Sequence, residues 1–344
     1  MSASSTPADL MAEGPPARKP AAPLLAVDGL VTEFRLPSGT IRANNGVSLS
    51  LEAGRTLGIV GESGSGKSVL CRALLKLIPS PPGFISAGEV RFDGRDLLRL
   101  DEEEMRRIRG RQIAMIFQNP MSGFNPVWPV GNQIVEGLHD LSASAARARG
   151  IELMRLAGIP SPEQRFHEYP HQWSGGMLQR AMIAMAMAGE PRLLLADEPT
   201  TALDVTIQDQ ILALLVELQE RTGMALLLVS HDMAVVAETC DEVAVMYAGR
   251  IVELAPTREL FEQPLHPYTV GLLGSLPHRR TSDGRLRPVR GQPPELLQLG
   301  PGCPFAERCP VASDDCRSTP VALRTLKPGH ASACLHPERI GTAI

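Results

Sequence analysis

The chain has 344 residues, of which 43% are hydrophobic and 21% charged, and its formal net charge is −4. This composition is that of a globular protein with one large core or two moderate ones. The acidic balance gives no basic surface for nucleic acid, and no uncharged apolar run approaches the roughly 20 residues that cross a bilayer.

The N-terminal residues 1–23 are rich in Pro and Ala and lack the apolar stretch of a signal peptide. We therefore expect a disordered tail and a chain that works in the reducing cytosol. Any role at a membrane would then be exercised through partner proteins.

Residues 24 to about 60 alternate apolar and polar side chains between turn residues, which predicts short antiparallel strands. The run RTLGIV leads into a Gly-rich loop and a helix, KSVLCRALLKLI, with apolar residues at helical spacing. The charge run DEEEMRRIRGR predicts a solvent-exposed helix face.

The pattern is helical from about 125 to 190, and two apolar strands follow, RLLLAD and MALLLVS, separated by the amphipathic helix TIQDQILALLVELQERT. Apolar strands that alternate with helices predict a largely parallel sheet covered on both faces. Beyond about 275 the chain is rich in Pro and Gly and has little periodicity, which indicates a change of domain.

A phosphate-binding loop is predicted where GESGSGKS fits the pattern G-x-x-x-x-G-K-[ST] between a strand and a helix. Its glycines let backbone N–H groups surround phosphate oxygens, the lysine would reach the β and γ phosphates, and the serine would bind Mg²⁺. The alternative is a Gly-rich turn without a ligand. The residues are Gly61, Glu62, Ser63, Gly64, Ser65, Gly66, Lys67 and Ser68.

Two carboxylates follow an apolar strand in LLLADEPT. Asp197 is predicted to hold Mg²⁺ through water. Glu198, just beyond the strand, can orient and deprotonate the attacking water. Without the phosphate loop, both would be ordinary exposed acids at a strand end.

The stretch WSGGMLQR, with Ser174, Gly175 and Gly176, opens a helix with a hydroxyl and exposed backbone amides. It is a second possible anion-binding helix start, although alone it would be a plain N-cap.

These motifs together resemble the nucleotide-binding subunit of an ABC transporter. Walker A GESGSGKS, Q-loop IAMIFQNP, signature SGG, Walker B LLLADEP, D-loop TALD and switch SHD occur in family order within residues 24–275. The resemblance implies an α/β fold: a P-loop domain with a mixed-sheet core, an antiparallel β subdomain and a helical subdomain at about 120–190. A small irregular, Cys-containing extension, residues 276–344, would follow.

The resemblance also assigns roles. ATP would be held between two subunits, with Ser174, Gly175 and Gly176 on the γ-phosphate bound by the opposing subunit and Asp204 at the subunit seam. Gln118 would sense Mg²⁺ and the γ-phosphate while its loop touches the membrane subunit, and His231 would hold the γ-phosphate and water. Phe34 is a candidate to stack on adenine. Alone, Gln118 would be a polar residue at a strand end, His231 a structural residue and Phe34 a core residue.

The C-terminal sequence resembles that of ATPase subunits of oligopeptide, dipeptide and nickel importers in two segments, PLHPYTVGLLGSLP and RGQPPELLQLGPGCPFAERCPVASDDC. SGGMLQRAMIAMAMAGEP is similar to the D-type subunit, which pairs with an F-type ATPase. This implies two membrane permease subunits, an extracytoplasmic solute-binding protein and a peripheral place on the cytoplasmic face of the membrane. A non-transport ATPase, regulatory or linked to nucleic acid, is the alternative; the acidic charge disfavours it.

Four cysteines close to the C-terminus have the spacing C-x5-C-x6-C-x17-C: Cys303, Cys309, Cys316 and Cys334. A reducing compartment disfavours disulfides, and the tight knuckle of structural zinc is absent. Four thiolates suit an iron–sulfur cluster, and the resemblance implies a 4Fe-4S cluster. Zinc, with His330 or His336, and unligated thiols remain alternatives.

Overall fold

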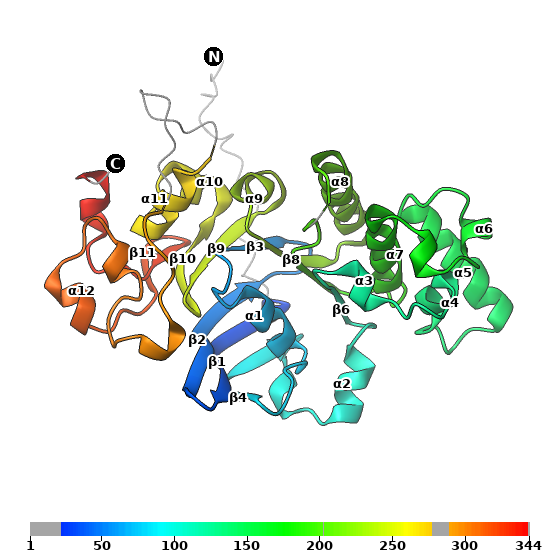
Figure 1. Cartoon of the computed structure of the whole chain (residues 1–344), viewed down its shortest axis with the longest axis horizontal. Coiled ribbons are helices and arrows are strands. Elements are labelled where there is room, and N and C mark those ends of the chain that lie inside the picture. The colour runs from blue at the N-terminus through cyan, green and yellow to red at the C-terminus, as the bar shows by residue number, and fades with distance from the viewer. Residues whose placement is uncertain (1–21, 202, 277–288, 343–344) are drawn as a thin grey trace, which may run out of the picture.

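An eight-stranded sheet forms the centre of the computed structural model, which describes residues 22–201, 203–276 and 289–342. Its strand order is β11-β12-β10-β9-β3-β8-β7-β6 (Figure 1). The five strands from β9 to β6 run parallel, which confirms the predicted sheet. The strands are β3 (Thr56–Val60), β6 (Ile113–Ile116), β7 (Leu193–Asp197), β8 (Ala225–Ser230), β9 (Glu242–Tyr247), β10 (Arg250–Pro256), β11 (Arg324–Lys327) and β12 (His330–Ser332).

The central strands are apolar throughout because both faces of the sheet are covered. Alternate residues of β7 enter different cores: Leu193 and Leu195 pack with β1, β2 and α1, whereas Leu194 and Ala196 pack with α7 and α8. The five parallel strands thus carry polar residues only at their ends, and the site residues follow the ends of β3, β6, β7 and β8.

A second, antiparallel sheet has the order β2-β1-β4-β5. Its strands are β1 (Leu25–Leu36), β2 (Gly39–Leu51), β4 (Gly83–Phe92) and β5 (Arg95–Asp96). The prediction of short strands was wrong for β1 and β2, which have 12 and 13 residues. The pairing of β1 with β2 shifts register near Gly29 and Gly46. These shifts interrupt the alternation of apolar and polar side chains without ending the strands.

Helices between 120 and 187 gather beyond the β6 edge of the sheet (Figure 1). They are α3 (Pro120–Gly123), α4 (Val130–Val135), α5 (Ala143–Leu156), α6 (Pro162–Arg165) and α7 (Gly175–Met187). The remaining helices are α1 (Lys67–Leu74), α2 (Glu102–Ile108), α8 (Val205–Thr222), α9 (Met233–Thr239), α10 (Thr257–Glu262), α11 (Pro267–Leu273) and α12 (Asp314–Ser318). As the charge run predicted, α2 exposes its charged side chains and buries only Met105 and Ile108.

The C-terminal extension is less irregular than the sequence indicates, because it adds two strands to the main sheet. Strand β12 pairs antiparallel with β10, and β11 pairs with β12. The junction contains a buried pair in which His330 Nε2 lies 2.7 Å from Glu253 Oε1, with both side chains fully buried. Strands of four and three residues are too short to show a period in the sequence.

Within the described ranges, no helix has both the length and the apolar character needed to span a membrane. The predicted disordered tail, residues 1–23, falls almost wholly outside those ranges.

Candidate functional site

The phosphate loop joins the end of β3 to the start of α1, as predicted. Gly61 has φ +155° and Gly66 has φ +105°. A Cβ at Gly61 would overlap the carbonyl oxygen of Met246, and one at Gly66 would overlap that of Ala43. The loop therefore passes between two backbones at positions that only glycine can occupy.

Lys67 lies inside this loop with 4% of its side chain exposed. Its Nζ donates to the carbonyl oxygens of Gly61 at 2.8 Å and Glu62 at 3.0 Å. Burial lowers the pKa of Lys67, while the nearby carboxylates, Glu198 foremost, raise it. The ammonium group is thus fixed at the loop, where it can pair with a phosphate oxygen.

Two oxygen ligands suited to Mg²⁺ lie together at the end of β7. Ser68 Oγ donates to Asp197 Oδ1 at 2.8 Å. Asp197 is buried, and this burial raises the pKa of its carboxyl against the opposing effect of the Ser68 hydrogen bond. A divalent cation at this position would offset the cost of the buried carboxylate.

The carboxylate of Glu198 is the point where the other predicted catalytic residues meet. Its Oε2 accepts hydrogen bonds from Gln118 Nε2 and Thr201 Oγ1, both at 2.9 Å, and lies 3.6 Å from His231 Nδ1. Oε1 lies 3.9 Å from Lys67 Nζ. The backbone of Glu198 is left-handed, with φ +47°, a strained conformation of the kind found at active sites.

Thr201 was not predicted from the sequence. It follows Glu198 by three residues in a turn, Thr201 N–H donating to the Glu198 carbonyl at 3.2 Å. The two threonines in DEPTT follow Glu198 closely in the sequence, which indicates that one of them could donate to its carboxylate. The sequence does not identify which threonine does so.

The signature residues begin α7. Ser174 caps the helix, its Oγ accepting from Met177 N–H at 3.3 Å, and a Cβ at Gly176 would lie 2.9 Å from Ile207. Asp204 caps α8 in the same way, accepting from Ile207 N–H at 3.0 Å. The two predicted groups are therefore neighbours through Ile207.

The signature residues do not meet the phosphate loop of the same chain. Figure 1 shows α1 and α7 apart, and among the described residues no hydrogen bond joins Ser174 to the loop. The chain brings Lys67, Ser68, Asp197, Glu198, Gln118 and His231 together at one site and presents Ser174, Gly175, Gly176 and Asp204 elsewhere.

Phe34 lies on β1 between Ile41 of β2 and Gly83 of β4. It is half-buried, and a Cβ at Gly83 would lie 2.8 Å from its ring. The ring thus covers the Gly83 backbone, and its contact with adenine stays a prediction.

The four C-terminal cysteines are free thiols that line one small pocket with residues such as His266, Phe305 and His336. Burial raises the pKa of Cys303 to about 11 and that of Cys334 to about 12. A metal that binds these thiols must therefore displace protons. His330 lies outside the pocket lining, buried against Glu253.

The sulfur atoms of these cysteines do not form a compact group of three in the described part of the chain. A Zn–S distance of about 2.3 Å places the sulfurs of a tetrahedral zinc site roughly 3.8 Å apart. In the described part of the chain, no three of these cysteines have sulfurs within 4.8 Å of one another; the group that does meet this limit is Asp315, Cys316 and His336. The thiols around this pocket are therefore not arranged, as they stand, at the spacing of a tetrahedral zinc site.

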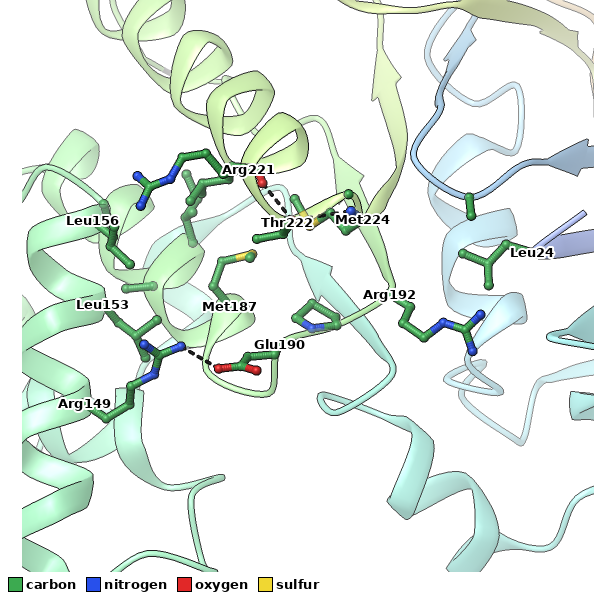
Figure 2. Close-up of a pocket in the computed structure, with 17 residues that line it drawn as sticks. Leu24, Arg149, Leu153, Leu156, Met187, Glu190, Arg192, Arg221, Thr222 and Met224 are labelled. Atoms are coloured by element: carbon green, nitrogen blue, oxygen red, sulfur yellow. Dashed lines mark hydrogen bonds and ion pairs between the residues drawn. The ribbon is translucent and has the colours of Figure 1, made fainter. Parts of the chain in front are cut away.

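A separate cavity of about 420 Å³ lies between α5, the end of α7 and the end of α8 (Figure 2). Leu153, Met187 and Met224 contribute to its apolar lining, and Arg149 at its edge pairs with Glu190 at 2.8 Å. None of the predicted site residues lines it. Its position excludes it as the phosphate site.

Comparison with known proteins gives two family matches. Residues 44–201 match the model described as ABC transporter, and residues 252–316 match the model described as oligopeptide/dipeptide transporter, C-terminal region.

Several curated proteins are similar over most of their length. The probable peptide ABC transporter ATP-binding protein y4tR of Sinorhizobium fredii is 50% identical, over 90% of this chain and 94% of that protein. The oligopeptide transport ATP-binding protein OppD of Bacillus subtilis is 50% identical, over 84% and 82% respectively. The dipeptide transport ATP-binding protein DppD of Escherichia coli is 47% identical, over 91% and 97%.

Among solved structures, a dimeric post-hydrolysis state of the ATP-binding cassette MJ0796 bound to ADP and Pi is similar. The TM-score is 0.62 at 27% identity, covering 68% of this chain and 99% of that one. The cassette cbiO1 from Clostridium perfringens, part of the ABC transporter complex cbiONQ, has a TM-score of 0.60 at 27% identity, covering 70% and 91%.

Proposed function

The chain belongs to the family of ABC transporter ATP-binding subunits, and on that premise we propose that it hydrolyses ATP to drive the import of oligopeptides or dipeptides through a membrane permease. The observation that carries this proposal is that Gln118 and His231 converge on Glu198 beside the phosphate loop, where Ser68 bonds to the adjacent Asp197. The names of the relatives, all peptide transport proteins, supply the cargo class.

The residues divide the hydrolysis between them. The amides of the loop and Lys67 bind the β and γ phosphates, and Ser68, Asp197 and Gln118 would hold Mg²⁺, which neutralises phosphate charge when bound. Glu198 accepts a proton from the attacking water. The water oxygen bonds to the γ-phosphorus while the bond from that phosphorus to the ADP oxygen breaks. His231 orients the γ-phosphate and the water, and the products are ADP and phosphate.

A second cassette completes the site in this proposal. Ser174, Gly175 and Gly176 would contact the γ-phosphate held by the partner's phosphate loop, with Asp204 at the seam. The separation of these residues from the chain's own loop supports this arrangement, as does the dimeric state of the similar cassette MJ0796. We expect the second cassette to be an F-type subunit.

Exposed apolar side chains around the Q-loop support contact with a permease. Between 36% and 75% of the surface is exposed at Phe117, which directly precedes Gln118, at Met121 three residues after it, and at Val127 and Trp128 in the segment that follows. Such a patch favours burial against a partner protein. The chain would thus sit peripherally on the cytoplasmic face, below two permease subunits that receive solute from an extracytoplasmic binding protein.

A variant tests this docking surface. Trp128→Ala should reduce co-purification of the chain with the permease, because it removes a large apolar contact from the patch. Leu141→Ala is the matched control, since Leu141 is similarly exposed but lies outside the Q-loop segment. Equal recovery of permease with both variants would place the contact elsewhere.

We further propose that Cys303, Cys309, Cys316 and Cys334 hold a 4Fe-4S cluster, which would staple a segment that has little core of its own. The shared pocket supports this choice over zinc, as does the finding that, among the described residues, no three of these thiols lie within 4.8 Å of one another. Iron and acid-labile sulfide in anaerobically purified chain should both be present at about four atoms per chain, the stoichiometry of such a cluster. Zinc without iron or sulfide would overturn the assignment.

The transport function is tested by reconstituting the chain with its permease and binding protein in vesicles. Uptake of labelled dipeptides and oligopeptides should require ATP and should stop with Lys67→Ala, because the phosphate contact is lost. Uptake that persists with Lys67→Ala, or vesicles that turn over ATP without moving any peptide, would contradict the proposal.

A further inference from the structure

Every polar group of Glu62, the second residue of the phosphate loop, has a partner. Its amide N–H donates to Tyr268 Oη at 2.8 Å, and its carbonyl oxygen accepts from Lys67 Nζ at 3.0 Å. Its carboxylate accepts two hydrogen bonds from Arg308, from Nη1 at 2.6 Å and Nη2 at 2.9 Å. The position of Glu62 therefore determines one of the two carbonyl oxygens that hold Lys67.

Arg308 is itself fixed on all sides. Its side chain is 6% exposed, Nε donates to the Arg290 carbonyl oxygen at 2.7 Å, and Nη1 also donates to Tyr247 Oη at 3.1 Å. The guanidinium lies 5.8 Å from the Phe305 ring centre. A partly buried bidentate pair of this kind fixes direction as well as distance, which a lysine cannot reproduce.

The turn that carries Arg308 is also a wall of the cysteine pocket. Residues 303–309 run from one cysteine to the next, and Phe305 and Ala306 line the pocket beside Cys303 and Cys309. Ala306 N–H donates to the Cys303 carbonyl at 3.1 Å, and Cys309 N–H donates to the Ala306 carbonyl at 3.4 Å. The backbone positions of the two cysteines therefore set the position of Arg308.

We propose that Arg308 is a positioning residue for the phosphate loop, through which the cysteine pocket of the C-terminal extension sets the affinity of the chain for ATP. The proposal rests on the assignment of the loop as the ATP site. It adds a route between two parts of the chain 246 residues apart. When the 303–309 turn is displaced, Glu62 loses its bidentate partner, and the loop is no longer held in the form that positions Lys67.

Equilibrium binding of trinitrophenyl-ATP to the full chain tests the route, with Glu198→Gln as the background so that nucleotide is not consumed. Arg308→Gln and Glu62→Gln should each weaken binding about tenfold, a typical coupling for residues in direct contact. The double variant should be no weaker than either single one. Arg308→Lys, which retains the charge without the fork, should fall between wild type and Arg308→Gln.

Lys327→Gln is the matched control. Lys327 belongs to the same extension but is exposed on β11, and its Nζ donates to Gln263 Oε1 at 2.7 Å, outside the 303–309 turn. It should leave the affinity within about twofold, as exposed pairs contribute little. Glu62→Gln controls for misfolding of the extension. It breaks the same pair by a substitution outside that segment, so a loss of affinity in this variant is not caused by a misfolded extension.

The pocket end of the route is tested with Cys309→Ser. This variant should weaken binding of trinitrophenyl-ATP when Arg308 is present and should add nothing in the Arg308→Gln chain. Equal affinity of wild type, Arg308→Gln and Glu62→Gln would reduce Arg308 to a structural staple and overturn the proposal. Additive losses from Cys309→Ser and Arg308→Gln would likewise overturn it. Failure of peptide uptake would refute the proposed function while leaving these affinities unchanged.

Discussion

Replacing Glu198 by Gln tests the chemical step most selectively, because glutamine keeps the size of the side chain and removes its basicity. The amide oxygen can still accept the hydrogen bonds from Gln118 and Thr201 that now reach Oε2 at 2.9 Å. The surrounding geometry should therefore persist, and the substitution isolates the loss of a proton acceptor.

The expected size of the effect follows from the role of Glu198. A positioned general base contributes about 10²- to 10⁴-fold to a rate, or roughly 3–5 kcal/mol of barrier. We expect Glu198→Gln to lower kcat by such a factor while ATP binding stays near that of wild type. Phosphate release by the reconstituted complex at saturating Mg-ATP measures the rate, and nucleotide binding measures the affinity.

Thr201→Val is the matched control for this prediction. It removes one hydrogen bond to the same carboxylate oxygen but leaves the base, so kcat should fall only about fivefold, which corresponds to about 1 kcal/mol for one hydrogen bond. Turnover by Glu198→Gln within about threefold of wild type would refute the assignment of Glu198 as the base. An equal loss in both variants would make Glu198 a structural residue.

Three further predictions concern the framework of the site. Burial raises the pKa of Asp197 in the folded chain, so the folded chain is most stable while this carboxyl is protonated and loses stability as the pH rises above the ordinary value of 3.8. Asp197→Asn should therefore raise the melting temperature of the Mg²⁺-free chain at pH 7, and the gain should shrink toward pH 4. No gain at pH 7 would contradict this. His330→Ala breaks the buried pair with Glu253 and should cost about 3–5 kcal/mol of unfolding free energy, measured by denaturant titration. Replacing Glu253 and His330 together by leucine should recover much of that loss. A loss under about 1 kcal/mol for His330→Ala would show that the pair is not buried as described. Gly66→Ala should abolish ATP binding, because its Cβ would overlap the carbonyl oxygen of Ala43. Gly64→Ala has open space around its Cβ and should cost only about 1–2 kcal/mol of backbone strain. Equal ATP affinities of the two variants would refute the close approach of Gly66 to Ala43.

The motifs could be predicted from the sequence because each is short and local. A strand, an eight-residue motif and the helix that the motif begins specify the phosphate site within one segment, and the apolar run before Asp197 specifies its strand. The parallel sheet then brings the ends of β3 and β7 to the same edge, so that Ser68 meets Asp197 although 129 residues separate them.

Contacts between distant segments without periodicity could not be predicted. The pairing of β12 with β10 and the bond between Arg308 and Glu62 link positions 77 and 246 residues apart, and neither pair has a sequence pattern of its own. The strands β1 and β2 were predicted, but as shorter ones, because bulges break the period of two that identifies a strand.

Hydrolysis of ATP is proposed to take place between two cassettes, because this chain holds its own phosphate loop and signature residues apart. The direct measurement is ATP turnover by single chains immobilised at a density that prevents any two from meeting, with and without the second cassette added in solution. We predict turnover at the rate of the assembled complex only after the second cassette is added. Full turnover by the isolated chain would contradict the account.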